Sequence, residues 1–229
     1  MEKDTMLAAG RTCTLYKSER PECLLIQPTD EHDREVLDQE VETIRSLARR
    51  PFTLVAFQIK DWQRELTPWS APAVFGKTPF GDGAPGTLVF IEGKLMAQLK
   101  RAGLYHKDTM PCLLGGYSLA GLFALWAAYQ SPVFNGIAAV SPSVWYPRWM
   151  EYALAHRPFA PAVYLSLGDK EEKTRNVVMA QVGNNIRRQH DLLTAQAVNT
   201  TLEWNVGNHF QHPDERTAKG FAWLMNHQY

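Results

Sequence analysis

The sequence has no excess of charge of either sign, because 24 Lys and Arg residues balance 24 Asp and Glu residues. It also lacks a run of Lys or Arg long enough for a nucleic-acid patch, so we expect no nucleic-acid partner. His, Cys, Asp and Glu do not occur at metal-ligand spacings, and there is no glycine-rich phosphate loop with its lysine. We therefore expect neither a metal nor a cofactor.

Cysteine is also scarce. The three cysteines, Cys13, Cys23 and Cys112, are an odd number, as expected of reduced thiols in a cytoplasmic protein, and a Cys13–Cys23 disulfide is the disfavoured alternative. Residues 1–11 contain no apolar core of signal-peptide length. Residues 109–147 carry no formal charge, but Gly and Pro interrupt them too often for a membrane helix. We expect a cytoplasmic protein that does not enter the membrane.

Hydrophobic residues make up 45% of the chain and charged residues 21%, which is the balance of a globular protein with a large core. We predict strands at residues 11–16, 23–27, 52–59, 111–115, 136–140, 162–167 and 200–205. We predict helices at residues 37–47, 88–99, 119–129, 178–193 and from 214 onward.

This alternation predicts one domain over residues 1–229, an α/β fold with a mainly parallel, doubly wound sheet and helices on both faces. A polar, proline-containing segment separates the first two strands, which permits a hairpin between them. Residues 61–86 are rich in Pro, Gly and aromatic residues, and we interpret them as a long surface loop.

The most informative motif lies where an apolar strand meets an apolar helix, at residues 115–121, which read Gly-Gly-Tyr-Ser-Leu-Ala-Gly. A sharp strand-to-helix turn holds a serine exposed and needs small neighbours, which Gly116 and Ala120 supply. It also aims the N–H of Leu119 and the positive helix end at a developing oxyanion. The pattern favours Ser118 as a nucleophile, although a tight turn without chemistry is the alternative for this segment taken alone.

One of the seven histidines, His209, directly follows the predicted last strand, at the edge where open α/β sheets place their sites. The other six lie in helical or charged surface contexts. Hydrolases of α/β type have an acid between serine and histidine in chain order. Residues 166–172 supply Glu171, three residues past Gly168, and Asp169, which directly follows that glycine at the end of the strand. We favour Glu171 and keep Asp169 as the alternative acid.

With these residues in view, the chain resembles the esterase family of α/β-hydrolases that includes esterase D and the enterochelin (siderophore) esterases. The resemblance spans most of the chain and rests on four segments in this order, residues 116–126, 141–145, 166–171 and 207–210. It implies the α/β-hydrolase fold, with Ser118 as nucleophile, His209 as general base and Glu171 or Asp169 as the acid that orients it.

The chain departs from this family at the oxyanion hole. Relatives commonly use a glycine-bearing loop after an early strand, whereas residues 27–29 here read Gln-Pro-Thr. Proline has no N–H to donate. We therefore expect the backbone N–H of Leu119 as one donor and that of Thr29 as the second, with another source as the alternative to Thr29.

Together these patterns predict a serine hydrolase that cleaves carboxylic esters through an acyl-enzyme on Ser118, with His209 as base. The expected substrate is a small acyl ester or a siderophore-type ester. An acyltransferase or thioesterase would use the same three residues, and a non-catalytic binding domain on the same fold is the alternative outside the enzymes. The oligomeric state cannot be read from the sequence.

Overall fold

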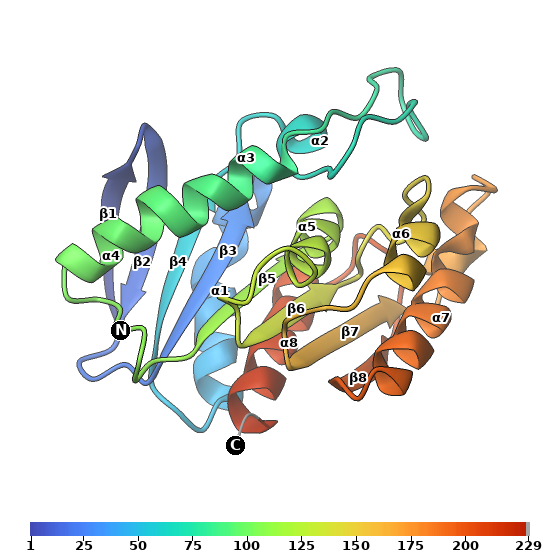
Figure 1. Cartoon of the computed structure of the whole chain (residues 1–229). Helices are drawn as coiled ribbons and strands as arrows, with labels where there is room; N and C mark the ends of the chain where they lie inside the picture. Colours follow the sequence, from blue (N-terminus) through green and yellow to red (C-terminus); the bar gives the residue numbers. More distant parts are fainter. Residues whose placement is uncertain (228–229) are drawn as a thin grey trace.

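The protein is described by a computed structural model, which covers residues 1–227. Over these residues the chain forms one eight-stranded sheet in the order β1-β2-β4-β3-β5-β6-β7-β8, with helices on both faces (Figure 1). The strands are Glu2–Ala8 (β1), Arg11–Lys17 (β2), Cys23–Thr29 (β3), Phe52–Gln58 (β4), Cys112–Tyr117 (β5), Gly136–Val140 (β6), Ala162–Gly168 (β7) and Asn199–Asn205 (β8). Strands β3 to β8 are parallel, and β2 runs against its neighbours β1 and β4. The prediction of a mainly parallel, doubly wound sheet is confirmed.

The helices alternate with the strands as the apolar patterns predict. They are Glu31–Leu47 (α1), Trp62–Glu65 (α2), Ala84–Val89 (α3), Phe90–Leu95 (η1, a π-helical turn), Met96–Arg101 (α4), Leu119–Ala127 (α5), Trp149–Ala155 (α6), Glu171–Lys173 (η2), Met179–Gln181 (η3), Val182–Ala195 (α7) and Pro213–His227 (α8). Figure 1 shows α1 and α8 on one face of the sheet and α4, α5 and α7 on the other. All expected strands and helices are present, most of them with shifted ends, and β1, α2, α6 and η2 are additional to them.

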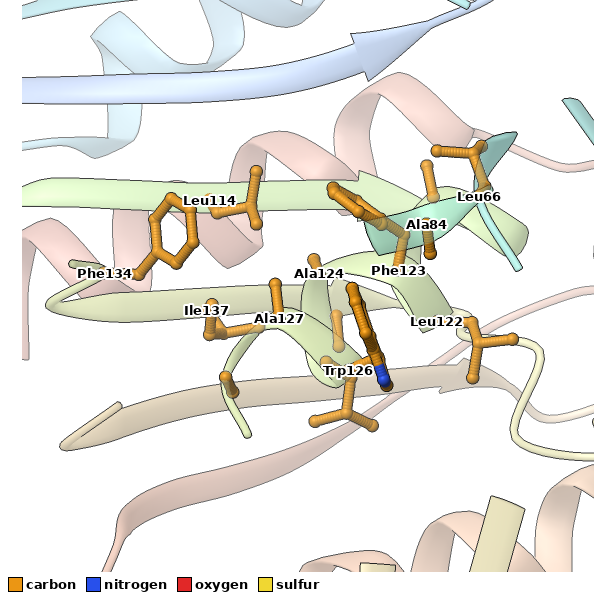
Figure 2. Packing of buried hydrophobic residues seen from close by; sticks show 14 of the residues in the cluster. Leu66, Ala84, Leu114, Leu122, Phe123, Ala124, Trp126, Ala127, Phe134 and Ile137 are labelled. Carbon is orange, nitrogen blue, oxygen red and sulfur yellow. The ribbon is translucent and has the colours of Figure 1, made fainter. Parts of the chain in front are cut away.

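The core has two layers because successive strand residues point to opposite faces. On β3, Leu25 packs in the layer under α1 and α8, whereas Leu24 and Ile26 pack in the layer under α5. Every residue of α5 is buried, which marks it as a central helix and not a surface one. Figure 2 shows its side chains Phe123 and Trp126 among those of β5 and β6. The residue preceding α5, Ser118, is therefore attached to a fully buried helix.

The hairpin permitted between residues 11–16 and 23–27 does not form, because β4 lies between β2 and β3. Strand β3 is buried at every position, as suits a central strand with neighbours on both sides. The hairpin partner of β2 is instead β1, through a two-residue turn in which Ala9 and Gly10 both have positive φ. Two-residue turns with positive φ at both positions favour Asn, Asp or Gly, so the alanine in this turn did not predict a hairpin.

The interpretation of residues 61–86 as a long surface loop is only partly right. This segment contains α2, the start of α3 and an isolated antiparallel bridge between Ala71 and Phe80. Leu66, Phe80 and Ala84 are buried in the core cluster. Aromatic and apolar anchors thus fix the segment onto the α5 face of the sheet.

The uncharged stretch at residues 109–147 forms β5, α5 and β6, a buried strand-helix-strand unit. No helix within residues 1–227 is both long and apolar enough to cross a membrane. All three cysteines are buried and free, which excludes the Cys13–Cys23 disulfide in this structure. In the described part of the chain, no group of three or more His, Cys, Asp and Glu side chains is arranged to hold a metal ion.

Candidate active site

Ser118 lies between β5 and α5 in a strained backbone conformation, with φ 60° and ψ −119°. Its N–H donates to the carbonyl of Val140 at 3.1 Å, which ties the turn to the adjacent strand. A Cβ on Gly116 would lie 2.6 Å from the Cβ of Ala120, so only glycine fits there. Strain of this kind costs about 1–3 kcal/mol and concentrates at functional sites. The turn therefore holds the half-buried Ser118 in a fixed orientation.

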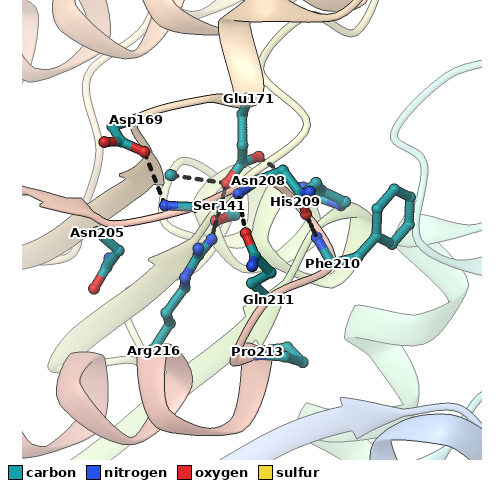
Figure 3. Close-up of polar contacts among 12 residues, drawn as sticks. Ser141, Asp169, Glu171, Asn205, Asn208, His209, Phe210, Gln211, Pro213 and Arg216 are labelled. Atoms are coloured by element: carbon teal, nitrogen blue, oxygen red, sulfur yellow. Dashed lines mark hydrogen bonds and ion pairs between the residues drawn. The ribbon is translucent and has the colours of Figure 1, made fainter.

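The structure brings Ser118, His209 and Glu171 together at the carboxyl edge of the sheet. His209, in the loop between β8 and α8, places Nε2 3.0 Å from Ser118 Oγ. Its Nδ1 lies 2.7 Å from Oε2 of Glu171, in the turn after β7 (Figure 3). A carboxylate only accepts, so Nδ1 carries the hydrogen and Nε2 presents a lone pair to the serine hydroxyl. This arrangement lets the imidazole take a proton from Ser118.

The carboxylate of Glu171 is almost enclosed, with 4% of its side chain exposed. Its Oε1 accepts hydrogen bonds from the N–H of Gly168 at 2.8 Å, the hydroxyl of Ser141 at 2.8 Å and Nη1 of Arg216 at 3.1 Å. Burial acts to raise the pKa of Glu171, but the hydrogen bond and charge of His209, with the donors at Gly168 and Ser141, bring the pKa below its ordinary value. The group is therefore ionised at neutral pH.

Asp169, the alternative acid, lies elsewhere. Its Oδ1 accepts the N–H of Gly207 at 2.8 Å, and its own N–H donates to the carbonyl of Asn205 at 2.8 Å. Asp169 thus joins the ends of β7 and β8 and makes no hydrogen bond or ion pair with His209 within residues 1–227. Of the two candidate acids, the structure brings Glu171 to the histidine.

The two expected oxyanion donors differ in their setting. Leu119 is the first residue of α5, so its N–H has no acceptor within the helix and points out of its positive end. Thr29 ends β3, fully buried, with its carbonyl accepting from Ile59 and its hydroxyl donating to the carbonyl of Phe57. Within the described chain no hydrogen bond joins Thr29 to Ser118. The role of the Thr29 N–H as second oxyanion donor therefore stays a prediction.

Four further residues contact the site without having been predicted. The hydroxyl of Ser143 lies 3.5 Å from Ser118 Oγ, and that of Tyr117 donates to the carbonyl of His209 at 2.9 Å. Ser141 and Arg216 contact Glu171 as described above. Burial and then the charge of Glu171 raise the pKa of Tyr117 to about 12, which keeps its hydroxyl protonated.

A sequence signal existed for Arg216. It shares a helical face with the buried residues Gly220, Phe221 and Leu224, so a positive charge lies on an apolar stripe. Buried charges are rarely left unpaired, and such a position indicates a partner inside the protein. The residue types alone did not identify Glu171 as that partner.

The order of the strands, their directions and the serine turn define the class: the chain has the α/β-hydrolase fold. Protein-family models and curated protein sequences give no match to the chain. Among solved structures, it is similar to the siderophore hydrolase EstA from Aspergillus nidulans, with TM-score 0.74 and 18% identity over 100% of this chain and 95% of that chain. It is also similar to the siderophore hydrolase EstB from Aspergillus nidulans, with TM-score 0.75 and 16% identity over 98% and 94%.

A third similar structure is the enterobactin esterase FES from Shigella flexneri in the presence of enterobactin, with TM-score 0.65 and 15% identity. The match covers 98% of this chain and 58% of that chain. The resemblance stated from the sequence motifs, to esterases of the enterochelin type, is thus confirmed at the level of the fold.

Proposed function

We propose that the protein is a serine hydrolase that cleaves carboxylic esters through an acyl-enzyme on Ser118. The observation that carries this proposal is the continuous contact from Ser118 Oγ through the His209 imidazole to the Glu171 carboxylate, at 3.0 and 2.7 Å. Nucleophile, base and orienting acid in that order are what acyl transfer requires. Glu171, not Asp169, is the acid in this proposal.

In the first half of the reaction, Ser118 Oγ attacks the ester carbonyl carbon while its proton passes to Nε2 of His209. Glu171 stabilises the resulting imidazolium, which then gives the proton to the departing alcohol. In the second half, water attacks the acyl-enzyme, Nε2 takes the water proton, and that proton returns to Ser118 Oγ as the acid leaves. These steps use protein groups alone, so the proposal includes no metal and no cofactor.

The oxyanion formed in both halves needs donors on its far side. We assign the N–H of Leu119 as the first donor, supported by the positive end of the fully buried helix α5. The N–H of Thr29 is proposed as the second, because Pro28 before it cannot donate. Loss of one such donor typically lowers turnover by about 100- to 1000-fold.

The proposed substrate is a small-molecule ester, either a small acyl ester or a siderophore-type ester. Two similar structures are named siderophore hydrolases and a third an enterobactin esterase, which supports the second choice. The His209 side chain is 27% exposed and Phe210 beside it is 88% exposed, so the nucleophile is reached from solvent. We further propose that residues 1–229 act as one domain.

Covalent labelling tests the proposal directly. A fluorophosphonate probe should modify Ser118, located by mass spectrometry of the digested protein, and Ser118→Ala should abolish modification. Ser166→Ala is the matched control, because Ser166 Oγ is buried without a hydrogen-bond partner among the described residues. Wild-type protein that resists the probe, or labelling that persists in Ser118→Ala, would overturn the assignment.

A panel of chromogenic esters of increasing acyl length, run beside a ferric catecholate lactone, then separates the two substrate classes. Thioester substrates and alcohol acceptors, added in parallel, distinguish hydrolysis of esters from thioester cleavage and acyl transfer. A protein labelled at Ser118 that turns over only with an alcohol acceptor would be an acyltransferase. A protein without labelling or turnover would be a binding domain on this fold.

A further inference from the structure

Arg216 lies in the first turns of α8 with its side chain 2% exposed, an unusual position for a permanently charged group. Its guanidinium points from α8 toward Glu171 and Ser141 (Figure 3). Nη1 donates to Oε1 of Glu171 and to the hydroxyl of Tyr117, each at 3.1 Å, and Nη2 donates to the carbonyl of Val206 at 3.1 Å. Both terminal nitrogens of the planar guanidinium therefore donate hydrogen bonds.

These three acceptors belong to the three chain segments that carry the proposed catalytic residues. Tyr117 directly precedes Ser118, Glu171 is the acid itself, and Val206 opens the loop that holds His209. A second connection closes the arrangement, since the Tyr117 hydroxyl donates to the backbone carbonyl of His209 at 2.9 Å. One side chain therefore joins the nucleophile turn, the acid turn and the histidine loop.

The Arg216–Glu171 pair is closely packed. A Cβ on Gly168 would lie 3.0 Å from both Nη1 of Arg216 and Oε1 of Glu171, so the backbone of β7 closes tightly over the pair. A lysine ammonium is a single point of charge and cannot reach acceptors in three directions in one plane. The nearest exposed cation on the same helix, Lys219, instead pairs with Glu203 at the surface.

We infer that Arg216 is a positioning residue for this site, whose guanidinium holds the Glu171 carboxylate and the His209 loop in register with Ser118. The inference rests on the proposed serine hydrolase function. Arg216 does not touch the serine oxygen, so it acts through Glu171, by holding that carboxylate and the His209 loop against one another. Its loss leaves Glu171 with the donors at Gly168 and Ser141 but frees the Val206 end of the histidine loop.

The test compares Arg216→Met and Arg216→Lys with wild type in steady-state kinetics and in the rate of fluorophosphonate labelling. We expect kcat per labelled site to fall about ten- to a hundredfold in both variants, as for loss of a hydrogen bond to a charged group, with KM within about twofold. Arg216→Lys should recover little of the lost kcat, because an ammonium cannot donate along the two directions that the guanidinium nitrogens serve. Lys219→Met on the same helix is the matched control and should retain wild-type kcat.

A double-mutant cycle separates positioning from general destabilisation. If Arg216 acts through the acid, Arg216→Met should slow labelling much less in a Glu171→Gln background than in wild type. Equal slowing in both backgrounds, or wild-type kcat per labelled site in the folded Arg216 variants, would overturn the inference. If Arg216→Met fails to fold, the same comparison is made with Arg216→Lys. Absence of labelling in wild type instead overturns the hydrolase proposal and is read independently.

Discussion

Ser118, the proposed nucleophile, has a backbone conformation that a residue with a Cβ rarely adopts. Its φ of 60° and ψ of −119° are tolerated because β5, β6 and α5 fix the flanking residues on both sides. The strain belongs to the folded state alone and is separate from the hydroxyl. Stability and reactivity at this residue can therefore be varied independently.

We predict that Ser118→Ala and Ser118→Gly both abolish labelling, but that Ser118→Gly has the higher melting temperature. Glycine relieves the strain of a positive φ, whereas alanine keeps the Cβ. The gain is reduced by the greater entropy that glycine loses on folding. Thermal unfolding followed by circular dichroism measures the difference. A glycine variant that melts below the alanine variant would show that this turn stores little strain.

The second prediction at the residue scale concerns the two carboxylates after β7. Glu171→Gln keeps the shape but cannot stabilise an imidazolium, and neutralising a triad acid typically lowers turnover on the order of ten-thousand-fold. Asp169→Asn should lower the melting temperature more than the rate, because a neutral amide accepts the N–H of Gly207 more weakly.

Kinetics and a melting curve on both variants decide this assignment. An inactive Asp169→Asn with unchanged melting temperature, beside an active Glu171→Gln, would reverse it. Full activity in both would leave a Ser118–His209 dyad.

At the scale of elements, α1 contributes an unusual buried acid. Glu40 is 3% exposed, and only its Oε2 has a partner, the side-chain amide of Gln27 on β3 at 3.3 Å. Oε1 of Glu40 and Oε1 of Gln27 both lack partners among the described residues. A proton on Glu40 would remove the cost of burying an ionised carboxylate with so few donors. Burial, together with the charges of Asp33 and Asp214, raises the pKa of Glu40 well above its ordinary value.

The raised pKa of Glu40 makes the free energy of unfolding depend on pH. An acid with a raised folded-state pKa holds a proton that the unfolded chain releases, so stability falls as pH rises above the unfolded pKa of about 4.3. Glu40→Gln removes this loss. We predict that the variant gains little over wild type near pH 4 and gains most at neutral pH and above. Urea unfolding of both proteins across this range measures the difference, and an equal gain at every pH would contradict it.

The elements also show what the sequence could and could not predict. Strands β3 to β7 are buried on both faces, so continuous apolar runs marked them. Strand β1 reads Glu-Lys-Asp-Thr-Met-Leu-Ala and is mostly exposed at the sheet edge, so no apolar pattern marked it. The site residues Ser118, His209 and Glu171 follow from strand ends and chain order. Arg216 and Tyr117 could not be placed, because their partners come from segments brought together only by the sheet.

At the scale of the whole molecule, burial in the two layers of the core predicts low reactivity for the cysteines. Burial is the largest cause that raises the pKa of Cys13 and of Cys23 to about 11, and it raises the pKa of Cys112 further. Thiols react as thiolates, so the native protein should react slowly with a thiol reagent at pH 8. We predict three rapidly reactive thiols in denaturant and almost none without it. Rapid reaction of a native cysteine would indicate local opening of β2, β3 or β5.

The same measurement bears on where the protein resides, because three free thiols per unfolded chain are what a reducing compartment leaves. Location in the cytoplasm stays a prediction from the cysteine content. A chain isolated with fewer than three titratable thiols would argue for an oxidising compartment.

The proposed catalytic contacts join residues far apart along the chain, since 91 positions separate Ser118 from His209 and 99 separate Tyr117 from Arg216. During synthesis, the serine turn can form as soon as β5, α5 and β6 have left the ribosome. His209 and Arg216 follow β8 in the chain, so the proposed catalytic contacts cannot form before β8 has been synthesised. We therefore predict that labelling of Ser118 begins only once β8 and α8 are in place, and the onset of labelling during refolding would time that step.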